Sequence, residues 1–229
     1  MSSPKMRAAL VALALVVGLP GCTNTRQDVS VWDAAKTIWN ARKTPTAAAP
    51  DERLIALEVK RALESDPGPL MLMRFERNKT IAVLRRIETN GQYWTWTTWG
   101  RLERRSITTK RGVVTATRGL GWDLMSSDVD HLLAMVETLG DGIRQQKLRH
   151  LDGENRIVES VADCAFTPDE PERYTAGTLD QTAVRVDVFC KTASGSFNNY
   201  YLVSRSGQIL QANQWLGPNL GHVTMWKLR

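Results

Sequence analysis

The chain has 229 residues, 42% of them hydrophobic, and a formal net charge of +6. A chain of this length can bury one substantial core or two small ones. The net charge falls to +4 once an N-terminal signal carrying Lys5 and Arg7 is removed. So mild an excess excludes the electrostatic footprint of a nucleic-acid-binding protein, and we expect no nucleic-acid partner.

Residues 1–21 are predicted to form a lipoprotein signal peptide. Lys5 and Arg7 precede an apolar run that is shorter than the roughly 20 residues of a transmembrane helix. The segment Leu19-Pro20-Gly21-Cys22 resembles a bacterial lipobox, whose cysteine becomes the acylated first residue of the mature chain. We therefore expect Cys22 to carry a lipid anchor, which several acyl chains make effectively permanent. Ordinary secretory cleavage and an uncleaved membrane anchor are the alternatives.

The two other cysteines are Cys164 and Cys190. With Cys22 acylated, they form the only intramolecular disulfide available in an oxidising periplasm. Two separate buried thiols are the alternative. No metal site or cofactor is expected, because no cysteine or histidine lies at ligand spacing nearby.

Residues 22–65 are predicted to form a tether and an N-terminal helical segment. Apolar residues recur at helical spacing over residues 30–43 and again, after a TPTAAAP break, over residues 51–65. In the second stretch Leu54, Leu57 and Leu63 are the candidate core contacts. Such helices pack on a sheet, bind a partner or lie on the membrane.

From Pro69 onward the pattern changes to strands. About five β-rich runs precede residue 119, and further runs follow residue 141. A loop rich in proline and acids is expected at residues 167–177. The turn signals are Asn78-Lys79, Asn90-Gly91, Arg111-Gly112, Asp152-Gly153 and Ser206-Gly207.

The stretch from Val113 to Leu139 joins a β-branched run, two glycines and a helical pattern. Ser127 lies three residues before Asp130, which predicts a capping box, and Gly140 is expected to end the helix in a left-handed conformation. Strand, glycine turn and helix also outline a phosphate-binding loop. The third glycine of a dinucleotide fingerprint and the Gly-Lys-Ser/Thr of a P-loop are missing. The glycines are therefore expected to turn a strand into a helix.

We predict a single mainly β (α+β) domain over residues 66–229. Its expected architecture is a large antiparallel meander that forms an open barrel or sandwich, with one inserted helix and N-terminal helices at its edge.

Tryptophans provide the best candidate binding feature. Trp94 and Trp96 share one face of a strand, and with Trp99 and Trp215 they would form a platform for sugar rings. Packing in the core is the interpretation that we favour for these rings. The turn that carries Arg118, Trp122 and Asp123 is the second candidate for binding.

No catalytic residues are expected. Asp123 with Asp128 or Asp130 would supply the paired acids of a glycosidase, but capping of free N–H groups at a helix start explains these acids better. Ser126 and Ser127 lack the G-x-S-x-G context of a nucleophile elbow.

Four runs of sequence resemble the group 4 capsule polysaccharide lipoproteins of the YjbF/GfcB type: PLMLMRFER, RGVVTATRGLGWDLMSSD, FNNYYLVS-RSGQI and NQWLGPNLGHV. The specific parts are the Thr-Arg-Gly-Leu-Gly-x-Asp-Leu-Met segment and the Gln-Trp-x-Gly-Pro-x-x-Gly ending. The resemblance spans roughly Asp66 to the C-terminus. It implies a mainly β outer-membrane lipoprotein, encoded with exopolysaccharide or capsule secretion genes and without established catalytic residues.

We therefore expect a lipoprotein held by Cys22 on the periplasmic side of the outer membrane, as an accessory to exopolysaccharide or capsule production or secretion. Asn24, which stands where a retention aspartate would, agrees with the outer membrane. The expected partners are the membrane, the proteins of the export machinery and the polysaccharide itself. A lipid- or hydrophobe-binding carrier and a glycan-modifying enzyme are the alternatives.

Overall fold

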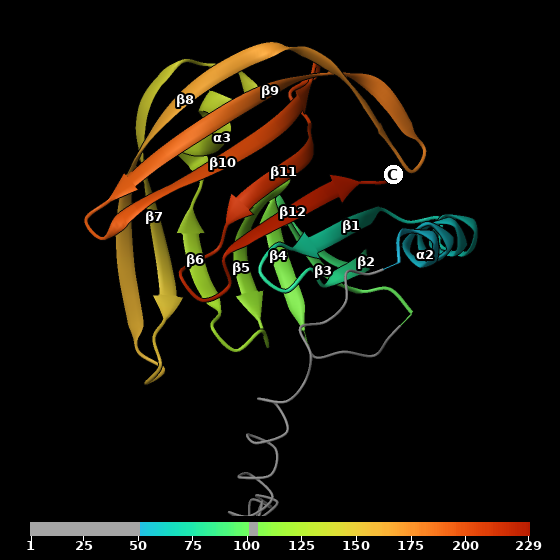
Figure 1. Cartoon of the computed structure of the whole chain (residues 1–229), viewed down its shortest axis with the longest axis horizontal. Helices are drawn as coiled ribbons and strands as arrows, with labels where there is room; N and C mark the ends of the chain where they lie inside the picture. Colours follow the sequence, from blue (N-terminus) through green and yellow to red (C-terminus); the bar gives the residue numbers. More distant parts are fainter. Residues whose placement is uncertain (1–50, 101–104) are drawn as a thin grey trace, which may run out of the picture. The chain divides into compact units, whose positions relative to one another are not determined.

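A computed structural model describes residues 51–100 and 105–229 (Figure 1). These residues belong to one compact unit, Pro45–Arg229. The expected lipidation site Cys22 and the helix expected at residues 30–43 lie outside the described residues. Within the described part of the chain, no helix is long and apolar enough to cross a membrane.

The described chain is mainly β, as predicted, with two helices and twelve strands. In chain order the elements are α2 (Glu52–Ser65), β1 (Leu70–Phe75), β2 (Ile81–Asn90), β3 (Tyr93–Thr98), β4 (Ser106–Lys110), β5 (Val113–Arg118), β6 (Leu124–Asp128), α3 (Asp130–Glu137), β7 (Gly142–Leu151), β8 (Ile157–Ala176), β9 (Leu179–Thr192), β10 (Gly195–Ser204), β11 (Ile209–Trp215) and β12 (His222–Lys227).

All twelve strands form one antiparallel sheet in the order β5-β4-β3-β2-β1-β12-β11-β10-β9-β8-β7-β6. The sheet curls into a nearly closed barrel, so the prediction of a barrel is confirmed (Figure 1). The two end strands, β5 and β6, meet through a side chain: the Leu124 N–H donates to Thr117 Oγ1 at 3.0 Å. Closing the sheet in this way protects edge strands that would otherwise pair with other chains.

A buried glutamine also ties β5 across the barrel. Gln214 on β11 is fully buried, and its Oε1 accepts the Val114 N–H at 2.9 Å. Its Nε2 donates to the Val114 carbonyl oxygen, also at 2.9 Å. One side chain therefore satisfies both backbone groups of a residue in an end strand, where a buried unpaired group would be costly.

Side chains alternate along the strands between the barrel interior and its outer face. Met71, Met73, Tyr201, Val223 and Met225 all belong to the main core, so their sequence neighbours point outward. The helix α3 adds four buried side chains to the same core: Leu132, Leu133, Met135 and Val136.

The helix α2 packs on the outer face of β1 and β2. The residues through which it does so differ in part from those predicted. Leu54 and Leu57 are 65% and 43% exposed, so their assignment to the core is wrong. Ala62 is fully buried, and Leu63 packs with it in a small cluster that includes Leu70, Val83 and Leu228. The apolar stripe is shifted toward the C-terminal half of the helix, where the chain turns into the sheet.

The predicted capping box does not form. Ser127 belongs to the short strand β6, which the sequence pattern missed, and α3 begins after Val129 without a side-chain cap. The helix end also differs: Leu139, rather than Gly140, is left-handed with φ 53°. The Gly140 N–H donates to the Met135 carbonyl oxygen at 2.8 Å, which is the bonding pattern of a Schellman ending.

The prediction of a loop at residues 167–177 is also wrong. The strand β8 runs through it to Ala176, with a register shift between Pro168 and Pro171 that accommodates the prolines. The tip of the β8–β9 hairpin rests on the C-terminus, where a Cβ at Gly177 would lie 2.3 Å from the Leu228 carbonyl oxygen. The hairpin is therefore held along its whole length, so ladder pairing overrides the local turn propensity.

The expected disulfide joins β8 to β9. Cys164 and Cys190 are directly paired in the ladder, and their sulfur atoms are 2.07 Å apart. Both side chains are completely buried in the main core.

Candidate functional site

A cavity of about 490 Å3 opens at one end of the barrel interior. Its walls come from β1, β3, β4, β11 and β12, from the end of α3, and from the β10–β11 turn. Its apolar wall is formed mainly by Met71, Trp94, Trp96, Ile209, Ala212 and Met225. A cavity of this size and lining lies within the range of small-molecule binding sites.

Trp94 and Trp96 share the inner face of β3, as predicted, and both line this cavity. Their ring centroids are 6.0 Å apart in an edge-on arrangement. The Trp96 ring is only 4% exposed, and its Nε1–H donates to Thr109 Oγ1 at 2.9 Å. Burial and this hydrogen bond therefore hold the Trp96 ring in place. Trp94 is half-buried, and the Arg86 guanidinium lies over its ring, 5.0 Å from the ring centroid.

Cationic side chains lie beside the apolar wall. Lys227 lines the cavity from β12, and burial together with the nearby Arg86 lowers the pKa of its ammonium group. The cavity's acid, Glu137, pairs with Arg111 at 2.5 Å. Burial raises the pKa of Glu137, and Arg111 opposes that rise. Glu137 is already paired with Arg111, and no ion pair within residues 51–100 and 105–229 compensates the positive charge of Lys227 and Arg86.

The structure does not gather the four tryptophans into one platform. Trp215 is absent from the cavity lining and stacks on Phe197, with ring centroids 4.4 Å apart. The His150 ring lies edge-on to the Trp215 ring, with the ring centroids 5.7 Å apart. Trp99 packs in the cluster beneath α2.

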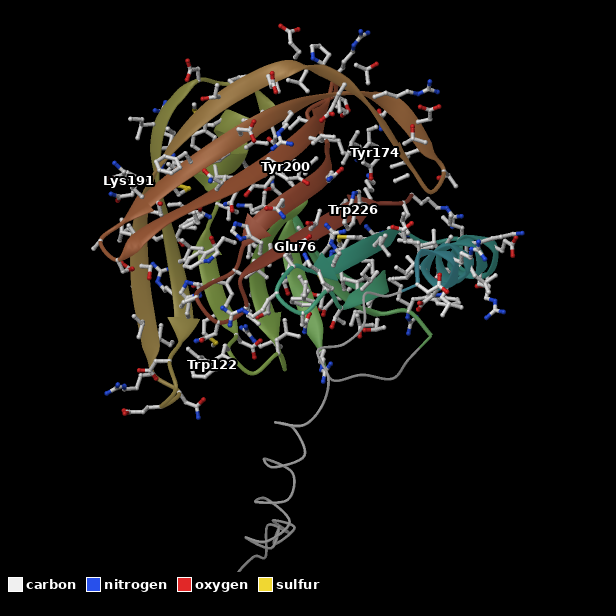
Figure 2. The ribbon with its side chains drawn as sticks, in the orientation of Figure 1. Glu76, Trp122, Tyr174, Lys191, Tyr200 and Trp226 are labelled. Carbon is white, nitrogen blue, oxygen red and sulfur yellow. A yellow bond between two sulfur atoms is a disulfide. The ribbon has the colours of Figure 1, made fainter. Side chains whose placement is uncertain are left out.

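The turn at Arg118, Trp122 and Asp123 is mainly a structural corner. Asp123 is buried and accepts hydrogen bonds from Thr117 Oγ1 at 2.7 Å and from the backbone N–H groups of Gly119 and Leu120. Arg118 donates to the backbone oxygen of Thr117 at 2.6 Å. Trp122 is 42% exposed and lies at the end of the barrel, well apart from Tyr200 and Trp226 (Figure 2).

The three acids of this region take separate partners. Asp128 pairs with Arg149 at 3.1 Å, and Asp130 pairs with Lys110. Asp123 is held by backbone and hydroxyl donors instead. Within residues 51–100 and 105–229, no group of three or more His, Cys, Asp or Glu side chains is placed to hold a metal ion.

Replacing Asp123 by alanine is expected to lower the free energy of unfolding by about 2–3 kcal/mol, because three donors lose their acceptor. Asp128→Ala is the control, since the exposed ion pair with Arg149 should contribute less than about 1 kcal/mol. Urea denaturation of both variants measures the difference. Equal losses would contradict a structural role for Asp123.

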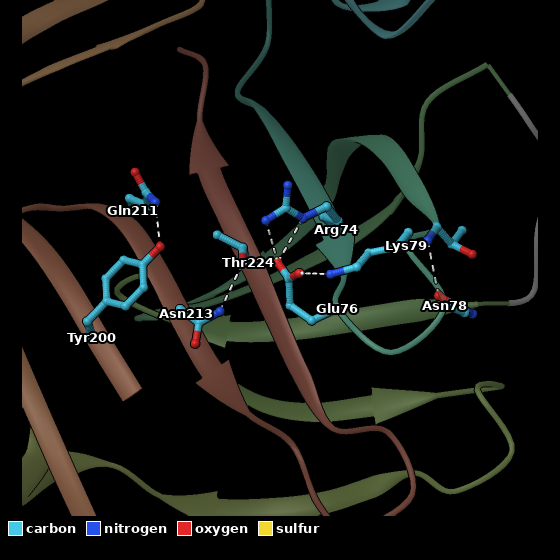
Figure 3. Close-up of polar contacts among 9 residues, drawn as sticks. Arg74, Glu76, Asn78, Lys79, Tyr200, Gln211, Asn213 and Thr224 are labelled. Atoms are coloured by element: carbon cyan, nitrogen blue, oxygen red, sulfur yellow. Dashed lines mark hydrogen bonds and ion pairs between the residues drawn. The ribbon is translucent and has the colours of Figure 1, made fainter. Parts of the chain in front are cut away.

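A polar and aromatic patch on the outer face was missed from the sequence. We call it the outer-wall patch, and it consists of Arg74, Glu76, Tyr200, Gln211, Asn213, Thr224 and Trp226 (Figures 2 and 3). Its residues alternate with core residues along β1, β10, β11 and β12, except Glu76, which directly follows β1. That alternation was visible in the sequence, but only the strand register places the side chains together: Asn213 is paired with both Tyr200 and Thr224.

Hydrogen bonds fix the outer-wall patch in one geometry. Gln211 Nε2 donates to the Tyr200 hydroxyl at 2.8 Å, and Asn213 Nδ2 donates to Thr224 Oγ1 at 2.9 Å (Figure 3). Thr224 in turn donates to Glu76 Oε1 at 2.5 Å. The Arg74 guanidinium lies 5.3 Å from the Trp226 ring centroid and also bonds Glu76. The patch therefore presents aromatic, amide and charged groups together on a rigid sheet.

Glu76 should give the protein an acid-dependent loss of stability. Burial raises the pKa of Glu76, but the hydrogen bonds from Thr224, Lys79 and Arg74 outweigh it and lower the pKa from 4.5 to about 2. A lowered folded-state pKa contributes stability that is complete above the unfolded pKa and is lost as the pH falls from about 4.5 to about 2. The shift corresponds to about 3–4 kcal/mol at neutral pH.

In Glu76→Gln the unfolding free energy should therefore be lower than that of the wild type at pH 7, and the gap should close toward pH 2. Urea denaturation across that range measures it, and the exposed Glu154→Gln is the control. A gap that stays constant with pH would show that Glu76 does not carry this dependence.

Comparison with known proteins identifies a family and solved structures of similar fold. A family model described as group 4 capsule polysaccharide lipoprotein GfcB, YjbF, matches residues 51–228. The crystal structure of the hypothetical lipoprotein YmcC from Escherichia coli K12 superposes with a TM-score of 0.63, at 15% identity, over 71% of this chain and 87% of that chain. A structure from Parabacteroides distasonis reaches a TM-score of only 0.27, at 12% identity, over 71% of this chain and 94% of that chain.

Comparison with curated protein sequences gives no match. The similarity to YmcC supports the fold alone, because the two sequences differ so widely. The family match covers α2 and the whole barrel, which is more than the segment from Asp66 onward that the sequence motifs indicated. The chain therefore belongs to the YjbF family of group 4 capsule polysaccharide lipoproteins.

Proposed function

We propose that this protein is an accessory lipoprotein of capsule or exopolysaccharide production or secretion. Cys22 anchors it to the outer membrane, on the periplasmic face, and it acts by binding the polysaccharide and proteins of the export machinery. The observation that carries the proposal is the family match over residues 51–228. The lipobox at Leu19–Cys22 supports the anchor.

The outer-wall patch supports direct contact with the glycan. Aromatic rings such as Tyr200 and Trp226 pack against the C–H faces of sugar rings, while amides and carboxylates exchange hydrogen bonds with hydroxyl groups. Gln211 and Asn213 supply amides on the same face. Each uses its side-chain nitrogen within the patch, and the two side-chain oxygens accept no hydrogen bond from residues 51–100 or 105–229. A rigid sheet holds these groups without the ordering cost of a loop.

The test is complementation of a deletion strain with the double variant Gln211→Ala, Asn213→Ala. These substitutions remove polar groups from the patch and leave the core contacts of Trp226 in place. We expect lower exopolysaccharide yield with unchanged protein level and only a small loss of thermal stability, because each lost hydrogen bond contributes about 1 kcal/mol. The exposed Ile157→Ala is the matched control and should restore the wild-type yield.

Trp226→Ala is a second, stronger perturbation of the same patch. Trp226 also packs beside Leu202 and Leu210, so its replacement can destabilise the fold. The exopolysaccharide yield of the Trp226→Ala strain is therefore compared with the measured stability of the variant protein. Full restoration of yield by the double variant and by a stably folded Trp226→Ala would rule out the patch as the glycan contact.

A further inference from the structure

The end cavity combines an apolar interior with a lysine in its wall, Lys227, and with Arg86, which lies over the ring of the lining Trp94. Met71, Trp94, Trp96 and Met225 supply the apolar wall. Lys227 stands beside Met71 in the strand register and points inward, because it alternates with the core residues Val223 and Met225. Arg86 alternates in the same way with the core residue Leu84 on β2.

Neither cation is neutralised within the described part of the chain. The ion pairs of residues 51–100 and 105–229 include neither Lys227 nor Arg86, and the cavity's Glu137 is occupied by Arg111. Arg86 instead rests on the Trp94 ring, and it is close enough to Lys227 to disfavour the ammonium charge. Two like charges beside an apolar wall lose hydration without gaining a Coulombic partner. An anion placed between them would recover that loss.

We propose that this cavity binds an amphipathic anion, with a hydrocarbon chain against Trp94, Trp96 and the methionines and a single anionic group on Lys227 and Arg86. A volume of about 490 Å3 is large enough for a chain of fatty-acid size. This inference concerns the barrel interior and does not depend on glycan contact at the outer face. A carboxylate and a lipid phosphate share the required chemistry, and the experiment separates them.

The test uses the full-length chain carrying Cys22→Ser, so that no acyl anchor competes for the site. Dodecanoate, its phosphate counterpart dodecyl phosphate, and the uncharged dodecanol are titrated while tryptophan fluorescence and calorimetric heat are recorded. We expect saturable binding of at least one anion, about tenfold tighter than that of dodecanol, because a charged hydrogen-bonded contact contributes roughly that factor. Whichever anion binds more tightly identifies the source as a carboxylate or a phosphate.

Variants locate the anionic group. Lys227→Gln and Arg86→Gln should each weaken binding of the preferred anion about tenfold and leave dodecanol binding nearly unchanged. Lys191→Gln, an exposed lysine on β9, is the matched control and should bind like the Cys22→Ser parent. Equal affinity for both anions and dodecanol, or the same loss in all three charge variants, would overturn the proposal.

Discussion

Replacing Gln214 by leucine is expected to lower the free energy of unfolding by about 3–5 kcal/mol, although the two side chains are similar in size. Gln214 is fully buried and bonds both backbone groups of Val114 at 2.9 Å. Leucine can satisfy neither, so a buried N–H and a buried carbonyl oxygen would lose their partners. Urea denaturation measures the loss.

The position of Val114 makes this loss hard to repair. It lies on β5, an end strand of the sheet, beside a register shift of the β4–β5 ladder between Thr108 and Thr109. Gln211→Leu is the control, because Gln211 lies on the outer face of the same strand, is half-buried and makes one side-chain bond. A similar loss in Gln211→Leu and Gln214→Leu would contradict the role of Gln214 in tying β5 to β11.

Reduction of the Cys164–Cys190 disulfide is expected to lower stability by about 3–4 kcal/mol. The bond closes a loop across a sequence separation of 26 residues, and such a crosslink restricts the unfolded chain by roughly that amount. Urea denaturation with and without a thiol reductant measures the effect. The double variant Cys164→Ala, Cys190→Ala is the control, and its midpoint should not respond to reductant.

A reductant that leaves the wild-type midpoint unchanged would show that the two thiols are not joined in the native protein. The expected effect is a large fraction of the net stability of a typical domain, which is about 5–15 kcal/mol. The proposed export to an oxidising compartment would therefore favour folding of this barrel, in agreement with the signal predicted at residues 1–21.

The period-two pattern made most of the barrel predictable. Alternation over Val184, Val186 and Val188 identifies a half-buried strand, and Asn90-Gly91 marks a hairpin turn that the structure contains with Gly91 at φ 58°. These signals are local, since a strand face and a tight turn are specified by neighbouring residues. The barrel follows because nearly every strand pairs with the next in sequence.

The failures arise where pairing across the sheet overrides local preference. Leu124–Asp128 contains serine and aspartate, which favour helix starts, yet it forms β6 because it pairs with β7. Residues 167–177 contain two prolines and still extend β8, since β9 supplies partners beyond the register shift. The sequence pattern within a segment does not show which other strand will pair with it.

The candidate sites show the same division. Trp94 and Trp96 could be placed on one face from spacing alone, and both line the cavity. Lys227 and Arg86 could not be placed beside them, because their proximity depends on how β12, β2 and β3 are ordered in the sheet. The outer-wall patch depends on register in the same way, across four strands whose order in the sheet differs from that in the chain.

Exopolysaccharide measurement in a deletion strain tests the central claim most directly. The strain is complemented with the wild-type chain or with Cys22→Ser, and the yield, composition and length of the polymer are compared. We predict that deletion lowers the yield or alters the polymer, that the wild-type chain restores it, and that the unacylated chain restores it poorly. Unchanged yield, composition and length in the deletion strain would contradict the account.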